Sequence, residues 1–384
     1  MIGPKFGLIS LCLSVLAACT STKAVDMPAK LVSINPVLEV NRLWSESLGG
    51  GGENFRLGLQ PTVDAGVVYA AGYKGSVVAL HAENGSHLWQ AKTGLVLSCG
   101  PAVGEGLVIV GGTDGVLLAL STEDGQERWR YQLSSEPLSK ALIAEQVVVI
   151  RTVDGRLLGL NASDGKARWS YEGAVPKLSL RGTARPVLAE AVGAVIEGFD
   201  DGKLVALDIK TGDLLWSATI DSPSGRTELD RLADVDAAAA VLGKDVFVAG
   251  YNGKVAMLDL SNGQVWWEKE ASSYRGFGVD AQTLYLSTSK GEVTALRRND
   301  GQQQWQQSAL LHRALTAPVE LNDSLVLGDL EGYVHWLSKA DGSLQARIST
   351  DGARMTNAPV VAEGRIYVQT DGGKLLAFEI KPKG

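Results

Sequence analysis

The chain has 384 residues, of which 45% are hydrophobic, and a formal net charge of −7. An acidic chain without clustered Lys and Arg is unsuited to nucleic acid, because binding requires cations that neutralise phosphates. The four histidines are scattered and form no metal-ligand spacing with the three cysteines, so no metal site is predicted. Forty-five glycines beside only six phenylalanines favour an all-β repeat protein with many turns.

The chain begins with a secretory signal. Lys5 precedes an apolar run from Phe6 to Ala18, which is too short to favour a spanning helix. The run ends Leu-Ala-Ala-Cys at Cys19, and this resembles the lipobox of bacterial lipoproteins. The resemblance implies that residues 1–18 are a signal peptide and that Cys19 is lipidated and becomes the first mature residue. The alternative is an ordinary signal peptide with an incidental cysteine.

Lipidation would hold the protein on a membrane surface through acyl chains, without a spanning segment. Thr20 follows the cysteine, and by resemblance to lipoprotein sorting this indicates the periplasmic face of the outer membrane. Processing would leave Cys99 as the only free thiol, so no intramolecular disulfide is expected. Residues 19–40 are predicted to be the lipidated cysteine and a tether, loosely structured from Thr20 to Leu38.

The rest of the chain, 41–384, repeats one pattern. In Asp201–Trp216, Gly202 is followed by Ala206-Leu207, by Gly212 and by Trp216, which reads as two short strands around a tight corner. Seven copies occur, and the two glycines are ten residues apart in each. The glycine pairs are Gly75/Gly85, Gly115/Gly125, Gly155/Gly165, Gly202/Gly212, Gly253/Gly263, Gly291/Gly301 and Gly332/Gly342. The seventh copy has Ala346 where tryptophan is expected.

An eighth copy starts at Asp371 and ends after one hairpin strand, whereas Asn41–Trp44 supplies a second strand without a hairpin before it. The N-terminal strand is therefore predicted to complete the last blade and close a ring, which removes exposed sheet edges. Two further strands precede each hairpin, giving four short strands in about 40 residues. The predicted fold is all-β, an eight-bladed propeller of four-stranded antiparallel blades closed by the N-terminal strand.

The pattern Ala-x-Asp-x-x-x-Gly-x-x-x-Trp, read at Ala206, Asp208, Gly212 and Trp216, resembles the quinoprotein-type blade. That resemblance raises the alternative of a quinone-cofactor-dependent dehydrogenase. Such an enzyme would be expected to carry adjacent cysteines, calcium-ligating acids and an axial cofactor pocket. The chain has no adjacent cysteine pair and no Gly-x-Ser-x-Gly motif. We therefore predict a protein that is not an enzyme and has no catalytic residues and no cofactor.

Two connections between copies are longer than the others. Most take 24 to 27 residues from the tryptophan to the next glycine, whereas Trp169 to Gly202 takes 33 and Trp216 to Gly253 takes 37. The insertions fall in consecutive outer-to-inner connections, 170–201 and 217–252, so we expect them to be neighbours on one face. Insertions on one face of a repeat protein often form its binding surface. Their mixture of apolar and charged residues is typical of a protein interface.

The lipobox, the eight quinoprotein-type blades and the segments LSLRG (178–182) and ELDRLADVD (228–236) together resemble the BamB family. These are propeller lipoproteins of the outer-membrane β-barrel assembly machinery. The resemblance implies a non-catalytic scaffold that binds the POTRA domains of BamA and assists insertion of β-barrel proteins. Carried over by position, the partner-binding residues are Leu178, Leu180, Arg181, Asp234 and Asp236.

Two other readings stay open at this point. A generic ligand-binding propeller would hold a ligand on its central axis, and a quinone-dependent enzyme would hold its cofactor there. Holding nascent outer-membrane proteins at a blade edge is a further role, for which the sequence gives little direct support.

Overall fold

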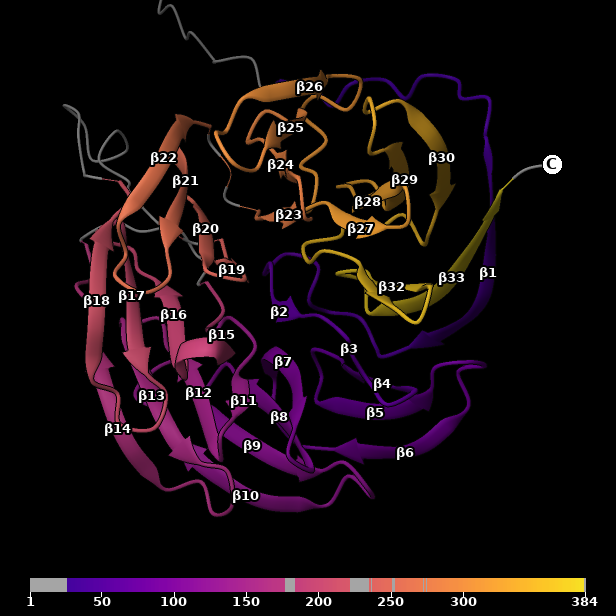
Figure 1. Ribbon diagram of the computed structural model, residues 1–384. Coiled ribbons are helices and arrows are strands. Elements are labelled where there is room, and N and C mark those ends of the chain that lie inside the picture. The colour runs from indigo at the N-terminus through magenta and orange to yellow at the C-terminus, as the bar shows by residue number, and fades with distance from the viewer. Residues whose placement is uncertain are drawn as a thin grey trace, which may run out of the picture.

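The computed structural model describes residues 26–176, 184–221, 235, 237–250, 253–271, 273 and 275–382. Eight antiparallel blades surround a central axis, as predicted (Figure 1). The first four blades consist, from the axis outward, of β3 (Thr62–Asp64), β4 (Val67–Ala71), β5 (Ser76–His81) and β6 (His87–Lys92); β7 (Leu97–Gly104), β8 (Leu107–Gly112), β9 (Val116–Ser121) and β10 (Glu127–Gln132); β11 (Leu142–Ala144), β12 (Val147–Arg151), β13 (Arg156–Asn161) and β14 (Ala167–Glu172); and β15 (Val187–Ala189), β16 (Ala194–Gly198), β17 (Lys203–Asp208) and β18 (Leu214–Thr219).

The last four blades follow the same order. They consist of β19 (Ala240–Leu242), β20 (Asp245–Ala249), β21 (Lys254–Asp259) and β22 (Val265–Glu270); β23 (Phe277–Val279), β24 (Thr283–Ser287), β25 (Val293–Arg297) and β26 (Gln303–Gln307); β27 (Val319–Leu321), β28 (Ser324–Gly328), β29 (Tyr333–Ser338) and β30 (Leu344–Ser349); and β31 (Val360–Ala362), β32 (Arg365–Gln369), β33 (Lys374–Pro382) and β1 (Leu38–Ser47).

Two features depart from regular four-stranded blades. A short strand β2 (Gly58–Leu59) pairs in parallel with β7 and gives the second blade a fifth strand. A 3-10 turn, η1 (Glu190–Val192), joins β15 to β16 in the fourth blade. The described part of the chain contains no helix long and apolar enough to cross a membrane.

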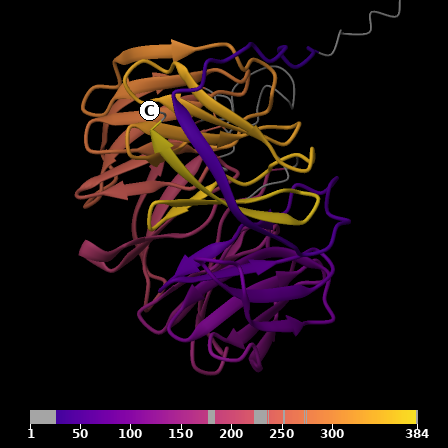
Figure 2. The same cartoon turned by 90° about the vertical axis from the view of Figure 1, so that its right-hand side faces the viewer.

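The N-terminal strand closes the ring. β1 runs antiparallel to β33 from the Leu38–Pro382 pair to the Ser47–Lys374 pair and so forms the outer strand of the eighth blade (Figure 2). The predicted closure is confirmed, and the strand starts at Leu38, three residues before residue 41 where we expected the propeller to begin.

Adjacent blades are joined by an indole ring that lies against a glycine. In seven junctions the outer-strand tryptophan of one blade donates its indole N–H to a carbonyl of the next, at 2.7–3.0 Å. A Cβ built on the corner glycine of that next blade would lie 2.6–2.8 Å from the indole. The same glycines have φ of 67–75°, so glycine satisfies both the backbone and the packing. The tryptophan–glycine pairs are 44/85, 89/125, 129/165, 169/212, 216/263, 267/301 and 305/342.

The seventh blade fills its wedge in another way. In the other complete hairpins a small or unbranched residue pairs across strands with the tryptophan, as Ala206 does with Trp216. In β29 and β30 the two residues are exchanged, because Trp336 pairs with Ala346 and is fully buried. Its ring meets Phe378 of the eighth blade edge-on at 6.5 Å between centroids. The missing tryptophan of the seventh copy is thus replaced from the neighbouring strand.

The described part of the predicted tether packs on the propeller from Ala29 onward. Ala29 N–H donates to the Leu311 carbonyl at 2.9 Å, and the Arg313 guanidinium donates to the Ala29 carbonyl at 2.9 Å. Further along, Val37 N–H donates to the Gln345 carbonyl at 3.0 Å. The expectation of a loose tether up to Leu38 is therefore wrong for residues 29–37, since backbone bonds to the sixth and seventh blades hold them.

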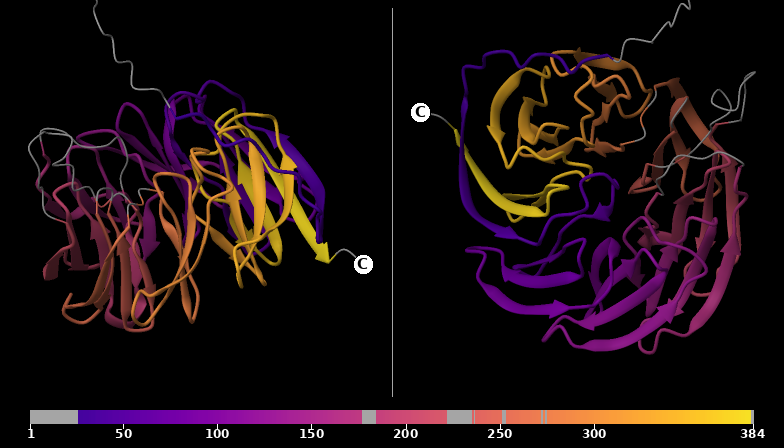
Figure 3. Two further views of the ribbon diagram at one scale, coloured as in Figure 1. Left: turned by 90° about the horizontal axis from the view of Figure 1, so that it is seen from above. Right: turned by 180° about the vertical axis from the view of Figure 1, so that it is seen from behind.

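Successive strands of a blade run in opposite directions, so the connections between them fall on two different faces of the ring. One face carries the turn between the second and third strands of each blade and the connection from the outer strand to the inner strand of the next blade. We call it the connection face; residues 133–141 and 199–202 lie there. The opposite hairpin face carries the turns between third and fourth strands, such as 209–213. Figure 3 (left) views the ring from its edge, between these faces.

Cys99 lies in the core of the second blade. Its side chain is 1% exposed, and burial raises the pKa of the thiol to about 12. A thiol with so high a pKa is unreactive at neutral pH. The environment therefore fits a small core residue.

We predict that Gly212→Ala destabilises the ring much more than Gly243→Ala. Both glycines have positive φ, but a Cβ on Gly212 would lie 2.6 Å from the Trp169 indole, whereas nothing lies within 4 Å at Gly243. The backbone cost alone is about 1 kcal/mol, and displacing the indole adds about 2 kcal/mol. Urea unfolding followed by tryptophan fluorescence measures the difference. Equal losses in the two variants would contradict the role of the indole–glycine contact.

Candidate partner-binding face

The residues predicted to bind a partner lie outside the described part of the chain. This holds for Leu178, Leu180 and Arg181 of the first insertion and for Asp234 and Asp236 of the second. The lipidated Cys19 also lies outside it. The ends of both insertions are described, and they show where each one leaves and rejoins the propeller.

Both insertions are rooted on the connection face of the fourth blade, at Phe199. This residue follows β16 and is 1% exposed. The first insertion leaves past Gly173, where an added Cβ would lie 2.0 Å from the Phe199 ring. The second returns at Val235, which is fully buried and whose N–H donates to the Phe199 carbonyl at 3.3 Å. One aromatic residue therefore contacts a root of each insertion, and the expectation that they are neighbours is confirmed for these roots.

A buried ion cluster lies beneath Phe199. The Arg151 guanidinium, at the end of β12, is 4.5 Å from the centroid of the Phe199 ring. It forms ion pairs with Asp200 and, at 3.4 Å, with Glu197, and it donates to the carbonyl of Gly198. All three charged side chains are at most 5% exposed. The cluster joins the third blade to the fourth, and loss of the cation would leave two carboxylates buried.

The connection face next to these roots exposes apolar side chains. Val175, in the first root, is 46% exposed, and Val153, in the turn between β12 and β13, is 37% exposed. The Val175 side chain lies over Gly155 in the same turn, where an added Cβ would be 2.4 Å from it. The two valines thus form a small exposed apolar contact beside the first root, of the kind that can extend a protein interface.

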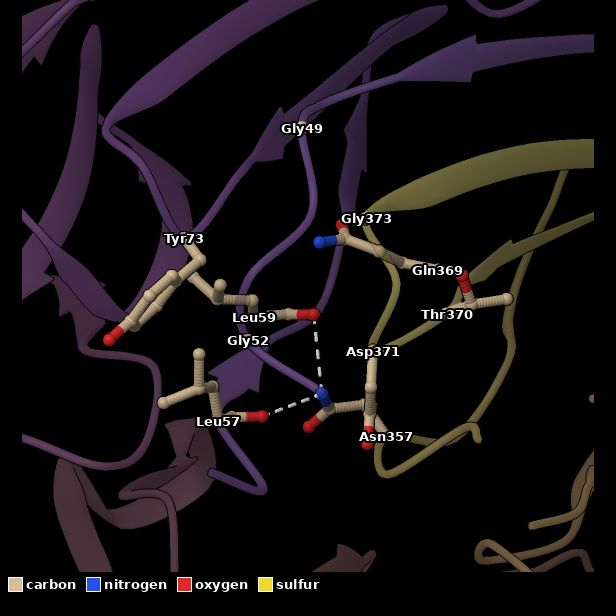
Figure 4. Close-up of a pocket in the computed structure, with 10 residues that line it drawn as sticks. All are labelled: Gly49, Gly52, Leu57, Leu59, Tyr73, Asn357, Gln369, Thr370, Asp371 and Gly373. Carbon is tan, nitrogen blue, oxygen red and sulfur yellow. Dashed lines mark hydrogen bonds between the residues drawn. The ribbon is translucent and has the colours of Figure 1, made fainter. Parts of the chain in front are cut away.

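The glycine run 49–52 connects β1 to β2. It lines a pocket of only about 20 Å³ at the seam between the eighth and first blades, together with Asp371 and Gly373 (Figure 4). The Asn357 amide spans this seam and donates to the carbonyls of Leu57 (2.9 Å) and Leu59 (3.2 Å). The pocket has room for about one water molecule, so the run serves as a connector.

Within the described residues, no group of three or more His, Cys, Asp or Glu is placed to hold a metal ion. The site residues that sequence reasoning missed are Phe199 and Arg151. Phe199 had a signal, because the position three residues before the first glycine of a copy is Gly, Thr or Asp in the other seven copies.

Comparisons with known proteins identify the family. A family model described as outer membrane protein assembly factor BamB matches residues 31–98, 73–307 and 289–382. A BamB of Pseudomonas aeruginosa is 44% identical over 377 residues, covering 97% of this chain and 98% of the relative. The chain belongs to the BamB family. A BamB of Escherichia coli is 36% identical and covers 97% of both chains.

Solved structures agree with this assignment. The crystal structure of BamB from Moraxella catarrhalis matches with a TM-score of 0.82 at 30% identity, covering 89% of this chain and all of that one. A quinohemoprotein alcohol dehydrogenase from Comamonas testosteroni matches with a TM-score of 0.68 at 15% identity, covering 88% of this chain and 76% of its own. The second likeness shows the fold alone. BamB is a family of assembly factors, not of enzymes, and the prediction of a non-enzyme is confirmed.

We predict that Phe199→Ala loosens the roots of both insertions together. Truncating a buried phenylalanine costs about 3–5 kcal/mol and here opens space beside Gly173 and Val235. Hydrogen exchange of the Gly173 and Val235 amides should become roughly tenfold faster or more. Phe378→Ala is the matched control, because Phe378 is fully buried in the eighth blade. Faster exchange at both amides in the control, or at neither in Phe199→Ala, would contradict the shared root.

Proposed function

We propose that this protein is a non-catalytic scaffold subunit of the outer-membrane protein assembly machinery, and that its two insertions bind the POTRA domains of BamA. The curated relatives are named as outer membrane protein assembly factors, which supports a role in assembling outer-membrane proteins. The single observation that carries the choice of surface is the shared root of the insertions at Phe199. A rigid ring with two neighbouring loops can present one continuous surface to a partner.

In this surface, Leu178 and Leu180 would supply apolar area that is buried on binding. Arg181 would donate charge-assisted hydrogen bonds to a carboxylate or carbonyl of the partner, and Asp234 and Asp236 would support the contact from the second loop. The exposed Val153 and Val175 extend the apolar area onto the described part of the connection face.

The N-terminal segment supports an arrangement in which the membrane anchor and the loops share one face. Ala29 is bonded to Leu311 and Arg313, which belong to the connection between β26 and β27 on the connection face. From Cys19 to Asp26 the chain can span at most about 25 Å, since an extended residue covers about 3.5 Å. A lipidated Cys19 would then hold this face close to the periplasmic surface of the outer membrane.

The anchor is tested by a Cys19→Ser variant, which cannot be lipidated at this position. The variant should be released into the soluble periplasmic fraction, and full retention in the membrane fraction would contradict the anchor.

The outermost strands offer a second surface. Leu214 and Leu215 on β18 are about half exposed, at 51% and 50%, and Val265 and Trp266 on β22 are 36% and 48% exposed. Both strands have an outer edge that pairs with no other described strand. Apolar side chains on an open edge are suited to adding an extended segment, so nascent outer-membrane proteins are a second candidate partner.

The loop assignment is tested by co-purification of BamA with the full-length chain. Replacing Leu178, Leu180 and Arg181 together by Ala should reduce BamA recovery by at least about tenfold, because such anchors carry most of the energy of an interface. The matched control replaces Leu88, Leu43 and Arg130 by Ala; these side chains are exposed on outer strands, away from the insertions. Undiminished recovery with a folded loop variant, or equal loss in the control, would contradict the proposal.

A further inference from the structure

A cavity lies on the propeller axis between the first residues of the innermost strands, and we call it the channel. Its volume is about 510 Å³, and residues from all eight blades line it. Among them are Thr62 of β3, Phe277 of β23 and Val360 of β31. The volume lies within the range of small-molecule sites. The wall is built mainly from residues at the beginnings of the innermost strands, so the channel opens on the connection face.

Three cations line this channel. Lys140, Arg185 and Arg275 each lie two residues before the first residue of an innermost strand, namely β11, β15 and β23. No Asp or Glu occurs among the described residues that line it. The repeat thus brings cations from three different blades to one ring of equivalent places around the axis.

The two neighbouring cations, Lys140 and Arg185, have little to balance their charge. The Lys140 ammonium donates to the Thr62 hydroxyl at 3.1 Å and to the Pro61 carbonyl at 3.4 Å, both neutral groups. Arg185 makes no hydrogen bond or ion pair with another described residue, although its side chain reaches the water of the channel. Arg275 donates to the Thr356 carbonyl at 3.3 Å on the far side.

The effect of this crowding appears in the ionisation of Lys140. Burial and the charge of Arg185 lower the pKa of the Lys140 ammonium to about 7. Two cations that destabilise each other in a concave site are stabilised by a counter-ion placed between them.

We propose that the axial channel binds a small polyvalent oxyanion, carrying carboxylate or phosphate-like groups, through Lys140 and Arg185. Arg185 suits a planar or tetrahedral oxyanion because its guanidinium presents paired donors. Innermost strands surround the site, so the ligand is a free small anion and not a bilayer surface. Anion binding at Lys140 and Arg185 does not depend on the proposed contact between the insertions and BamA. It would add a ligand-binding function to the scaffold.

Isothermal titration of the full-length chain in neutral detergent tests the proposal, with oxalate as the carboxylate probe and sulfate as the tetrahedral probe. At least one should bind saturably with one-to-one stoichiometry at low ionic strength. Lys140→Gln and Arg185→Gln should each weaken binding about tenfold or more, because each removes a charge-assisted hydrogen bond. Lys92→Gln, at an exposed end of β6, is the matched control and should bind as the unaltered chain does.

The pH dependence separates this role of Lys140 from a structural one. Among the described residues, Arg185 and Arg275 are the charged groups that share the channel wall with Lys140. Both probes keep a constant charge from pH 6 to 8, so deprotonation of Lys140 should weaken binding up to ~tenfold across this range. Lys140→Arg should retain binding and flatten this dependence. No saturable binding of either probe, or binding that neither Gln variant weakens, would overturn the proposal.

Discussion

The ring depends on an indole that fits only against a glycine. A tryptophan on the outer strand of one blade covers the corner of the next and donates a hydrogen bond to its backbone. The corner residue must be glycine for two reasons: its φ is positive, and a Cβ would overlap the indole ring. The same contact recurs at seven of the eight junctions and sets how neighbouring blades pack, so repetition of one blade pattern builds most of the ring.

Much of the fold follows from the sequence for this reason. The spacing from Gly202 through Gly212 to Trp216 predicts a hairpin, and the structure pairs Ala206 with Trp216 across it. Closure by the N-terminal strand is also predictable, since a lone outer strand and an incomplete hairpin stand at opposite ends of the chain. The exchange of Trp336 and Ala346 could not be predicted from the repeat pattern. The space between two blades can be filled from either of two paired strands, whereas the pattern looks for tryptophan on the outer strand alone and therefore shows only that it is missing there.

The candidate partner-binding face could be predicted less completely. The lengths of connections 170–201 and 217–252 point to it, because the other connections of the repeat show what length is ordinary. The contact between Phe199 and the two roots needs the fold, since Gly173 and Val235 are 62 residues apart in sequence. Packing of residues 29–37 was missed because that segment lacks strand periodicity and is held by backbone bonds. The roles of Leu178, Leu180, Arg181, Asp234 and Asp236 remain predictions from family resemblance.

We propose that the connection face is the functional side of the molecule. The roots of the insertions, the first bonded residues of the N-terminal segment and the mouth of the cationic channel all lie on it. The proposal that this face contacts BamA is tested most directly by photo-cross-linking. A cross-linking residue is placed at Leu180 in one variant and, in a second, at Leu214 at the hairpin-face end of β18. The account predicts a BamA adduct from position 180 and none from position 214. An adduct from position 214 alone would contradict it.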